Sequence, residues 1–99
     1  MRLALFLLFA VHCSFAQNSY TMVFLNKKST PANRTKEETA ELMKGHLANI
    51  NRLAKEKKLL VAGPFDGGGG IFILNTDSKQ MAQEWIGTDP GIQAGAWDI

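Results

Sequence analysis

Residues 59–75 read LLVAGPFDGGGGIFILN, and this stretch decides the fold. Two short runs of mostly apolar residues, 59–65 and 71–75, flank Asp66 and four consecutive glycines. Runs of this length suit β-strands, and a glycine-rich connection between them is typical of a hairpin turn. The stretch therefore predicts two neighbouring antiparallel strands in the middle of the chain.

Upstream of this hairpin, the sequence predicts an amphipathic helix that begins at Thr35. Thr35 followed by Glu38 is typical of a capping box, in which each side chain bonds the backbone amide of the other residue. A helical period then connects the apolar positions Ala40, Met43, Leu47, Ile50 and Ala54. Before the helix, residues 20–25 (YTMVFL) are apolar and aromatic and predict the first strand.

Downstream of the hairpin, residues 78–86 predict a second helix, which Gly87 is placed to end. Residues 88–91 (TDPG) predict a turn, and residues 95–99 (GAWDI) a last strand. The order β-α-β-β-α-β is the ferredoxin-like arrangement of the α+β class. One domain, residues 17–99, is therefore expected to form a four-stranded antiparallel sheet with two helices on one face.

The strands are apolar on both faces, which indicates a partner. In residues 20–25, Tyr20, Met22 and Phe24 oppose Val23 and Leu25. Two helices cover only one face of a sheet, and an antiparallel sheet normally turns a polar face to water. The uncovered face is therefore predicted to pack against a second copy of the chain in a homodimer.

Residues 1–16 predict a secretory signal peptide that is removed before Gln17. Arg2 precedes an uninterrupted apolar run over residues 3–11, and the small residues Ser14 and Ala16 stand where a signal peptidase requires them. The apolar run is too short for a permanent membrane span, although an uncleaved anchor or a buried helix is the alternative. A secreted or periplasmic protein is expected, with no membrane contact after cleavage.

Composition excludes several function classes. The 99 residues are 45% hydrophobic and 20% charged, which is typical of a globular protein. The net charge of +2 gives little attraction to nucleic acid. Cleavage would remove Cys13 and leave one histidine, so neither a disulfide nor a metal site is expected. Glycines 67–70 precede a strand and lack the lysine of a phosphate-binding loop, so no cofactor is predicted.

Three features could carry chemistry. His46 lies at the border of the apolar helix face, either as a general acid or base or as a core-edge histidine bonded to a carbonyl. Asp89 either orients His46, anchors a polar ligand, or serves only the turn before Pro90. Gly63, Pro64 and Asp66 form either a pocket wall or simply the bend that a hairpin needs.

The segments 41–50 (ELMKGHLANI), 58–66 (KLLVAGPFD) and 89–95 (DPGIQAG) resemble the YciI-like family over nearly the whole mature chain. That family is similar to the dimeric α/β-barrel superfamily, in which two ferredoxin-like protomers pack sheet against sheet. The resemblance implies a catalytic pair at His46 and Asp89 and a pocket lined by the strand that holds Gly63 and Pro64. The export signal and the short end after the last strand depart from the family.

Together these observations predict an exported, homodimeric enzyme acting on a small molecule. His46 and Asp89 would transfer a proton, as in an isomerase or a lyase, and Gly63, Pro64 and Asp66 would contact the substrate. The alternative is a non-catalytic module with the same dimeric fold, either binding a ligand or purely structural.

Overall fold

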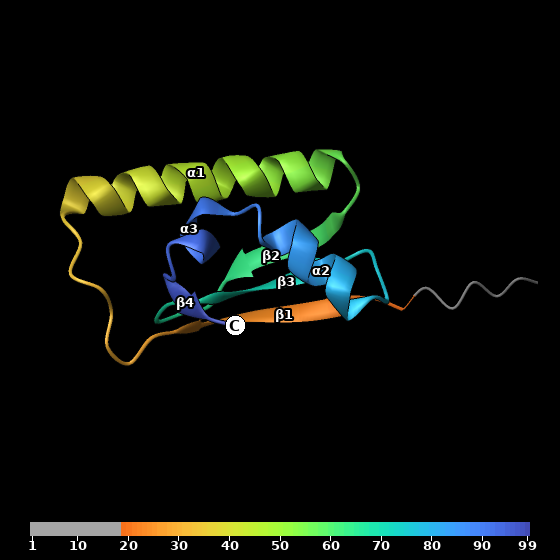
Figure 1. Cartoon of the computed structure of the whole chain (residues 1–99), viewed down its shortest axis with the longest axis horizontal. Coiled ribbons are helices and arrows are strands. Elements are labelled where there is room, and N and C mark those ends of the chain that lie inside the picture. The colour runs from red at the N-terminus through yellow and green to blue at the C-terminus, as the bar shows by residue number, and fades with distance from the viewer. Residues whose placement is uncertain (1–18) are drawn as a thin grey trace, which may run out of the picture.

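A computed structural model describes residues 19–99, and the predicted signal peptide lies outside the described residues. The strands form one antiparallel sheet in the order β2-β3-β1-β4. This arrangement confirms the α+β prediction and is compatible with a ferredoxin-like fold. Along the chain the elements are β1 (Thr21–Lys27), α1 (Lys36–Lys55), β2 (Leu59–Pro64), β3 (Gly70–Leu74), α2 (Lys79–Ile86), α3 (Pro90–Gln93) and β4 (Trp97–Asp98) (Figure 1).

Helix α1 begins where the capping box predicts. The Thr35 hydroxyl accepts a hydrogen bond from the Glu38 amide at 3.0 Å, and the Glu38 carboxylate accepts one from the Thr35 amide at 3.5 Å. Both bonds satisfy backbone donors that a helix start otherwise leaves unpaired. The first residue of the long helix is therefore determined locally, which sets the position of every side chain that α1 presents to the sheet.

A strained residue follows the end of α1. Lys57 has a φ of 61°, and within residues 19–99 it is the one residue other than glycine with a positive φ. A Cβ atom in this left-handed conformation costs about 1–2 kcal/mol. We expect Lys57→Gly to raise the free energy of unfolding by about 1 kcal/mol, measured by urea denaturation. Lys55→Gly, in the last turn of α1 itself, is the control and should lower that free energy.

The predicted turn over residues 88–91 is wrong, because a third helix, α3, begins at Pro90. The Asp89 carboxylate accepts hydrogen bonds from the amides of Gly91 and Ile92, and so acts as the N-cap. Proline at the first helical position lacks the amide that would have no partner there. The same residues that favour a turn therefore also favour a helix start, and the packing of α3 against α1 selects the helix.

The last strand is shorter than residues 95–99 predict. Gly95 has a φ of 68°, a turn conformation that ends the segment after α3 and leads into β4. Only Trp97 and Asp98 pair with β1, opposite Lys27 and Asn26.

The hydrophobic core lies between the helices and one face of the sheet. Val23 and Leu25 of β1 are buried, and so are Phe72 and Leu74 of β3, while the residues between them in β1 point to the other face. This alternation follows the two-residue period of a strand. The core cluster is completed by Leu53 of α1, Leu59 of β2, and Ala82 and Ile86 of α2. The helices thus cover one face of the sheet, as predicted.

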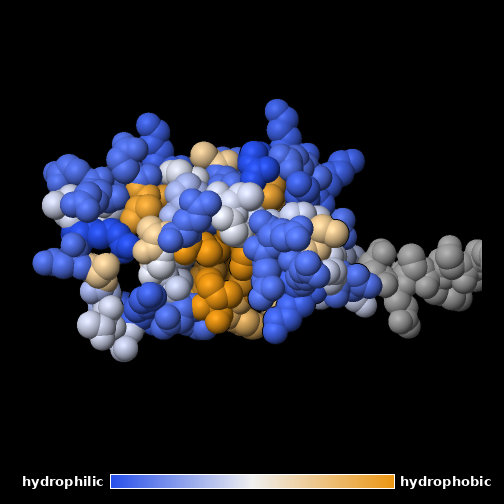
Figure 2. All heavy atoms as spheres, viewed as in Figure 1, coloured by the Kyte–Doolittle hydropathy of each residue, from blue (hydrophilic) through white to orange (hydrophobic). Residues whose placement is uncertain are grey.

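The opposite face of the sheet is apolar and exposed. Tyr20, Met22, Phe24 and Val61 have exposed fractions between 46% and 54%. The rings of Phe24 and Phe65 stack with their centres 6.3 Å apart. In the view of Figure 2, apolar surface also gathers at the middle of the molecule, between polar surfaces on either side. The prediction of two apolar faces is confirmed, and the second copy that would cover the open face stays a prediction.

Among residues 19–99, no helix is both long enough and apolar enough to cross a bilayer.

Candidate functional site

A buried hydrogen bond joins two residues that are distant in sequence. His46 is in the middle of α1, and Asp89 ends the short linker between α2 and α3. The Nδ1 atom of His46 lies 2.5 Å from Oδ2 of Asp89. Only 7% of His46 and 1% of Asp89 are exposed to solvent. The fold therefore brings together the two residues that the family resemblance implies as a catalytic pair.

Both oxygens of the Asp89 carboxylate accept hydrogen bonds. Its Oδ1 accepts from the Gly91 amide at 2.7 Å and from the Ile92 amide at 3.3 Å, while Oδ2 faces the His46 ring. An oxygen pair that accepts three N–H groups suits an ionised carboxylate, which has no proton of its own to donate. This arrangement identifies Nδ1 as the nitrogen of His46 that carries a proton. The other nitrogen, Nε2, makes no hydrogen bond within residues 19–99 and is free to act as an acceptor.

Two aromatic side chains hold the imidazole ring in place. Phe72 of β3 stacks on it with a centroid distance of 5.9 Å and an interplanar angle of 25°. Trp97 of β4 packs against it at 4.8 Å with an angle of 46°. Packing from two strands therefore restricts the orientation of the imidazole ring.

A cavity of about 300 Å³ opens beside His46, between α1 and the β2–β3 hairpin. This volume accommodates a small molecule. Of the side chains around the cavity, only His46 can ionise, and the rest of the wall is apolar side chains and glycine backbone. The lining consists of Met43, His46, Leu47, Ile50, Ala62, Gly63, Pro64, Gly69, Gly70 and Phe72.

The structure divides the residues that the sequence proposed for substrate contact. Gly63 and Pro64 line this cavity. Asp66 is exposed in the turn between β2 and β3 and does not line it. Asp89 also lies outside the lining, because it is buried behind the imidazole and reaches the cavity only through His46.

The hairpin glycines are required by geometry. Gly67, Gly68 and Gly69 all have positive φ values, which a side chain would strain. A Cβ on Gly70 would lie 2.6 Å from the carbonyl oxygen of Gly63, whereas a Cβ on Gly63 would meet nothing within 4 Å. The close backbone approach at this wall of the cavity therefore requires a glycine at position 70 and not at position 63.

This difference gives a matched pair of substitutions. We expect Gly70→Ala to lower the free energy of unfolding by about 1–3 kcal/mol, because neither backbone can move aside without breaking the β2–β3 pairing. Gly63→Ala should change it by no more than about 0.5 kcal/mol. Both values come from chemical denaturation. Equal effects of the two substitutions would contradict the assignment of the close contact to Gly70.

Gly45 allows α3 to approach α1. A Cβ on Gly45 would lie 3.0 Å from Cγ of Pro90, closer than packed carbon atoms normally come. Gly45 precedes His46, and Pro90 follows Asp89. The contact between the glycine and the proline ring therefore sets the spacing at which the histidine and the carboxylate meet.

Gly45→Ala consequently tests whether packing or helix propensity dominates at this position. Propensity alone would favour alanine by about 1 kcal/mol. We expect the variant instead to be destabilised by about 1 kcal/mol, because the proline ring is displaced. Ala40→Gly, at an exposed position of the same helix, measures the propensity difference without the contact. A stabilised Gly45→Ala protein would show that Pro90 can move aside freely.

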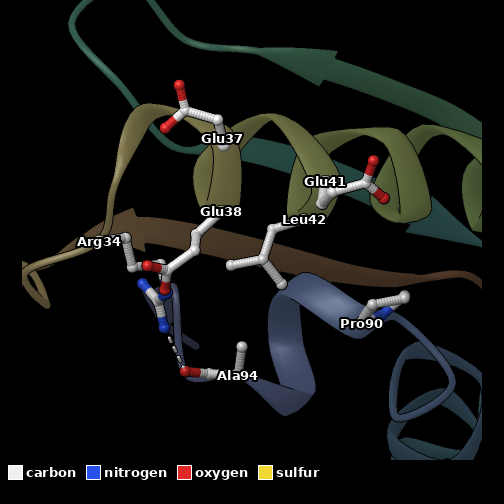
Figure 3. A pocket seen from close by; sticks show the side chains of 7 residues that line it. All are labelled: Arg34, Glu37, Glu38, Glu41, Leu42, Pro90 and Ala94. Atoms are coloured by element: carbon white, nitrogen blue, oxygen red, sulfur yellow. Dashed lines mark hydrogen bonds between the residues drawn. The ribbon is translucent and has the colours of Figure 1, made fainter.

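A larger hollow of about 560 Å³ lies elsewhere, where the start of α1 meets α3 (Figure 3). The Arg34 guanidinium donates a hydrogen bond to the Ala94 carbonyl at 2.7 Å across it. Figure 3 shows the carboxylates of Glu37 and Glu41 pointing away from this arginine. Neither His46 nor Asp89 lines this hollow, and it has no buried ionisable group, so the cavity beside His46 is the better candidate.

Sequence reasoning missed the residues that support the pair. Phe72 and Trp97 lie in other strands, and nothing local assigns them to His46. For Gly45 the sequence offers one signal, because a glycine inside a helix often marks a place where another segment packs closely against the helix. Among residues 19–99, no group of three or more His, Cys, Asp or Glu side chains is placed to hold a metal ion.

Comparison with known proteins places this architecture in a family. A family model described as the YCII-related domain matches residues 7–99. The uncharacterized protein YjpA of Bacillus subtilis (strain 168) is 34% identical over 67 residues, which cover 67% of this chain and 79% of that protein. No solved structure matches the chain. The chain belongs to the YCII-related domain family, as the resemblance to YciI-like proteins predicted.

Proposed function

We propose that this chain is an exported enzyme that moves a proton on a small molecule, with His46 as the acid–base group and Asp89 as its partner. One observation carries the proposal: a buried imidazole, paired with a carboxylate at 2.5 Å, lines a cavity of about 300 Å³. An imidazole can be neutral or charged near neutral pH, and a fixed tautomer directs its free nitrogen toward the substrate.

The chemistry proceeds through Nε2 of His46. This atom takes a proton from a carbon or oxygen of the substrate, and the ring becomes an imidazolium. Asp89 keeps its contact with Nδ1 and stabilises the positive charge without taking the proton. Nε2 then returns the proton at another substrate atom, which completes an isomerisation, or to a departing group, which completes an elimination.

The lining indicates what the cavity would accept. Its apolar side chains favour a compact molecule with a mostly apolar or aromatic body. The polar atom of that molecule would face His46. Gly63 and Pro64 would contribute to binding by shape, while Asp66 lies too far toward solvent to take part.

Hydrogen–deuterium exchange tests proton transfer without a known substrate. The protein is incubated in D₂O with a panel of small unsaturated lactones and cyclic carbonyl compounds, and the loss of each C–H signal is followed by proton NMR. We expect at least one compound to exchange faster with the protein than with buffer. Compounds that bind beside His46 without exchange would contradict the enzymatic function.

The alternative function is a dimeric module that binds a ligand without reaction. It is favoured by the absence of a second ionisable side chain in the cavity lining, because many acid–base enzymes use two such groups. Ligand-induced shifts of His46 resonances without any exchange would support this alternative. A purely structural module would show neither shifts nor exchange.

Assembly and export belong to the same proposal. The exposed apolar face, with Met22, Phe24 and Val61 about half exposed, supports a homodimer that packs sheet against sheet. Light scattering of the mature chain should give the mass of two copies.

The apolar run after Arg2 supports export, although the family match begins at residue 7, inside the predicted leader. Mass spectrometry of the exported protein should find Gln17 at its N-terminus.

A further inference from the structure

A second polar cluster lies next to the His46–Asp89 pair and is not part of the proposed chemistry. Asn49 and Arg52 follow His46 on α1, one turn and two turns later, and Thr88 directly precedes Asp89. The side chains of Asn49, Arg52 and Thr88 meet across the gap between α1 and the α2–α3 linker. We refer to these three residues as the Thr88 clamp.

Arg52 is the centre of the clamp. Its Nη2 donates to Oδ1 of Asn49 at 2.9 Å and to the Thr88 hydroxyl at 2.9 Å. The Thr88 hydroxyl lies 2.6 Å from the Trp85 carbonyl and 3.2 Å from Oδ1 of Asn49. Both of these oxygens are acceptors for its single proton, so the hydroxyl oxygen is itself an acceptor toward Arg52. The linker is thereby connected to α1 through a guanidinium group.

Glu56 keeps Arg52 in this position. Its carboxylate accepts from Nη1 of Arg52 at 2.8 Å and from Nζ of Lys58 at 2.9 Å. The hydrogen bonds from Lys58 and Arg52 lower the pKa of Glu56, so this carboxylate stays charged at neutral pH. The guanidinium is therefore held from one side by Glu56 and from the other by Asn49.

Asp89 lies between two contacts that attach its segment to α1. On one side Thr88 bonds to Arg52, and on the other Pro90 packs against Gly45. Contacts on both sides restrict how far the Asp89 carboxylate can move along or away from the helix. A shift of a few tenths of an ångström in either direction would lengthen the hydrogen bond to His46.

Asn49 provides an independent observation. It is 92% buried, and its Nδ2 atom is enclosed without a hydrogen-bond partner within residues 19–99. A buried donor without a partner destabilises a fold, and an apolar residue of similar size would avoid that cost. An asparagine at this position is consistent with a positioning role for Oδ1, which orients the arginine toward Thr88.

We propose that Asn49, Arg52 and Thr88 are positioning residues that hold Asp89 against His46, a role that rests on the proposed function of that pair. None of them lines the cavity beside His46, so they act through Asp89 and do not touch a substrate. Their removal should loosen the His46–Asp89 hydrogen bond while the rest of the fold is retained.

Proton NMR of the resting protein tests this role without any ligand. A short charge-assisted bond between Nδ1 and Oδ2 deshields its proton, so the wild-type protein should show a low-field resonance. His46→Asn identifies the signal, because it removes the imidazole. We expect Thr88→Val and Arg52→Met to lose this resonance or shift it upfield, and Thr88→Ser, which restores the hydroxyl, to retain it.

The control is Thr21→Val, the same chemical change at a partly buried hydroxyl that donates to the Thr76 carbonyl at 2.8 Å, away from the pair. It should leave the resonance unchanged. Asn49→Leu should weaken the resonance without lowering the melting temperature, because it also removes an unpaired buried donor. A merely structural role would instead lower the melting temperature and spare the resonance.

Retention of the wild-type resonance in both Thr88→Val and Arg52→Met would overturn the proposal. Its loss in Thr21→Val would do so as well, because the signal would then report general loosening. If Thr88→Val does not fold, the Arg52→Met variant alone tests the proposal. The Arg52 side chain is 44% exposed, so it can be replaced without opening the core. Failure of the hydrogen–deuterium exchange assay would contradict the proposed function alone. The low-field resonance is measured on the resting protein and needs no turnover.

Discussion

Asp89→Ala is expected to lower the free energy of unfolding by about 2–4 kcal/mol, the cost of leaving a buried donor without its charged acceptor and of removing a helix cap. The variant leaves Nδ1 of His46 without its acceptor in a site where only 7% of the residue is exposed. It also removes the cap of α3, whose first two free amides bond to Asp89. Urea denaturation followed by circular dichroism measures the difference.

Two further substitutions separate the contributions at this site. Asp89→Asn keeps an oxygen that can cap α3 but removes the negative charge. Its free energy of unfolding should therefore be higher than that of Asp89→Ala by the contribution of the helix cap, about 1 kcal/mol. Asp66→Ala is the matched control, because it removes a carboxylate from an exposed turn, and it should change stability by no more than about 0.5 kcal/mol. Similar costs for Asp89→Ala and Asp66→Ala would contradict the burial argument.

His46→Asn is expected to lower the rate of hydrogen–deuterium exchange on a responsive compound by about 10²–10⁴-fold, the usual contribution of a general acid–base group. The asparagine amide can occupy the place of Nδ1 and donate to Asp89, but it offers no base in place of Nε2. The variant should therefore remain folded and fail in proton transfer. Exchange rates by NMR and thermal melting curves measure the two properties on the same samples.

Glu41→Gln is the control for this loss, because Glu41 lines the separate hollow near the start of α1. It should leave the exchange rate unchanged. A His46→Asn protein that exchanges at the wild-type rate would assign the proton transfer to another group. A protein that binds the compound but never exchanges it would support the binding module instead.

Local sequence signals were sufficient for most of the backbone. The capping box at Thr35 and Glu38 placed the start of α1, because both partners are within one turn. The glycines between β2 and β3 predicted the hairpin, because positive φ values there exclude side chains. The 88–91 segment was misassigned, since Asp-Pro-Gly suits a turn and a helix start equally well, and only the packing against α1 distinguishes them.

The site required more than local signals. His46 and Asp89 could each be named as candidates, but their hydrogen bond spans 43 positions. The aromatic rings of Phe72 and Trp97 reach His46 from two different strands. Which residues surround an imidazole depends on the register of strands and the distance between helices, and neither is encoded in any short segment.

The amino-acid sequence by itself determined the order of every element except α3, the start of the long helix, the tight hairpin and the apolar character of both sheet faces. These properties follow from side-chain periodicity and from backbone restrictions that act over a few residues. Only the tertiary structure decided that Pro90 packs against Gly45 and that the Asp89 carboxylate therefore lies within hydrogen-bonding distance of His46. That contact depends on close packing between distant segments, where a single methyl group is enough to change the distance.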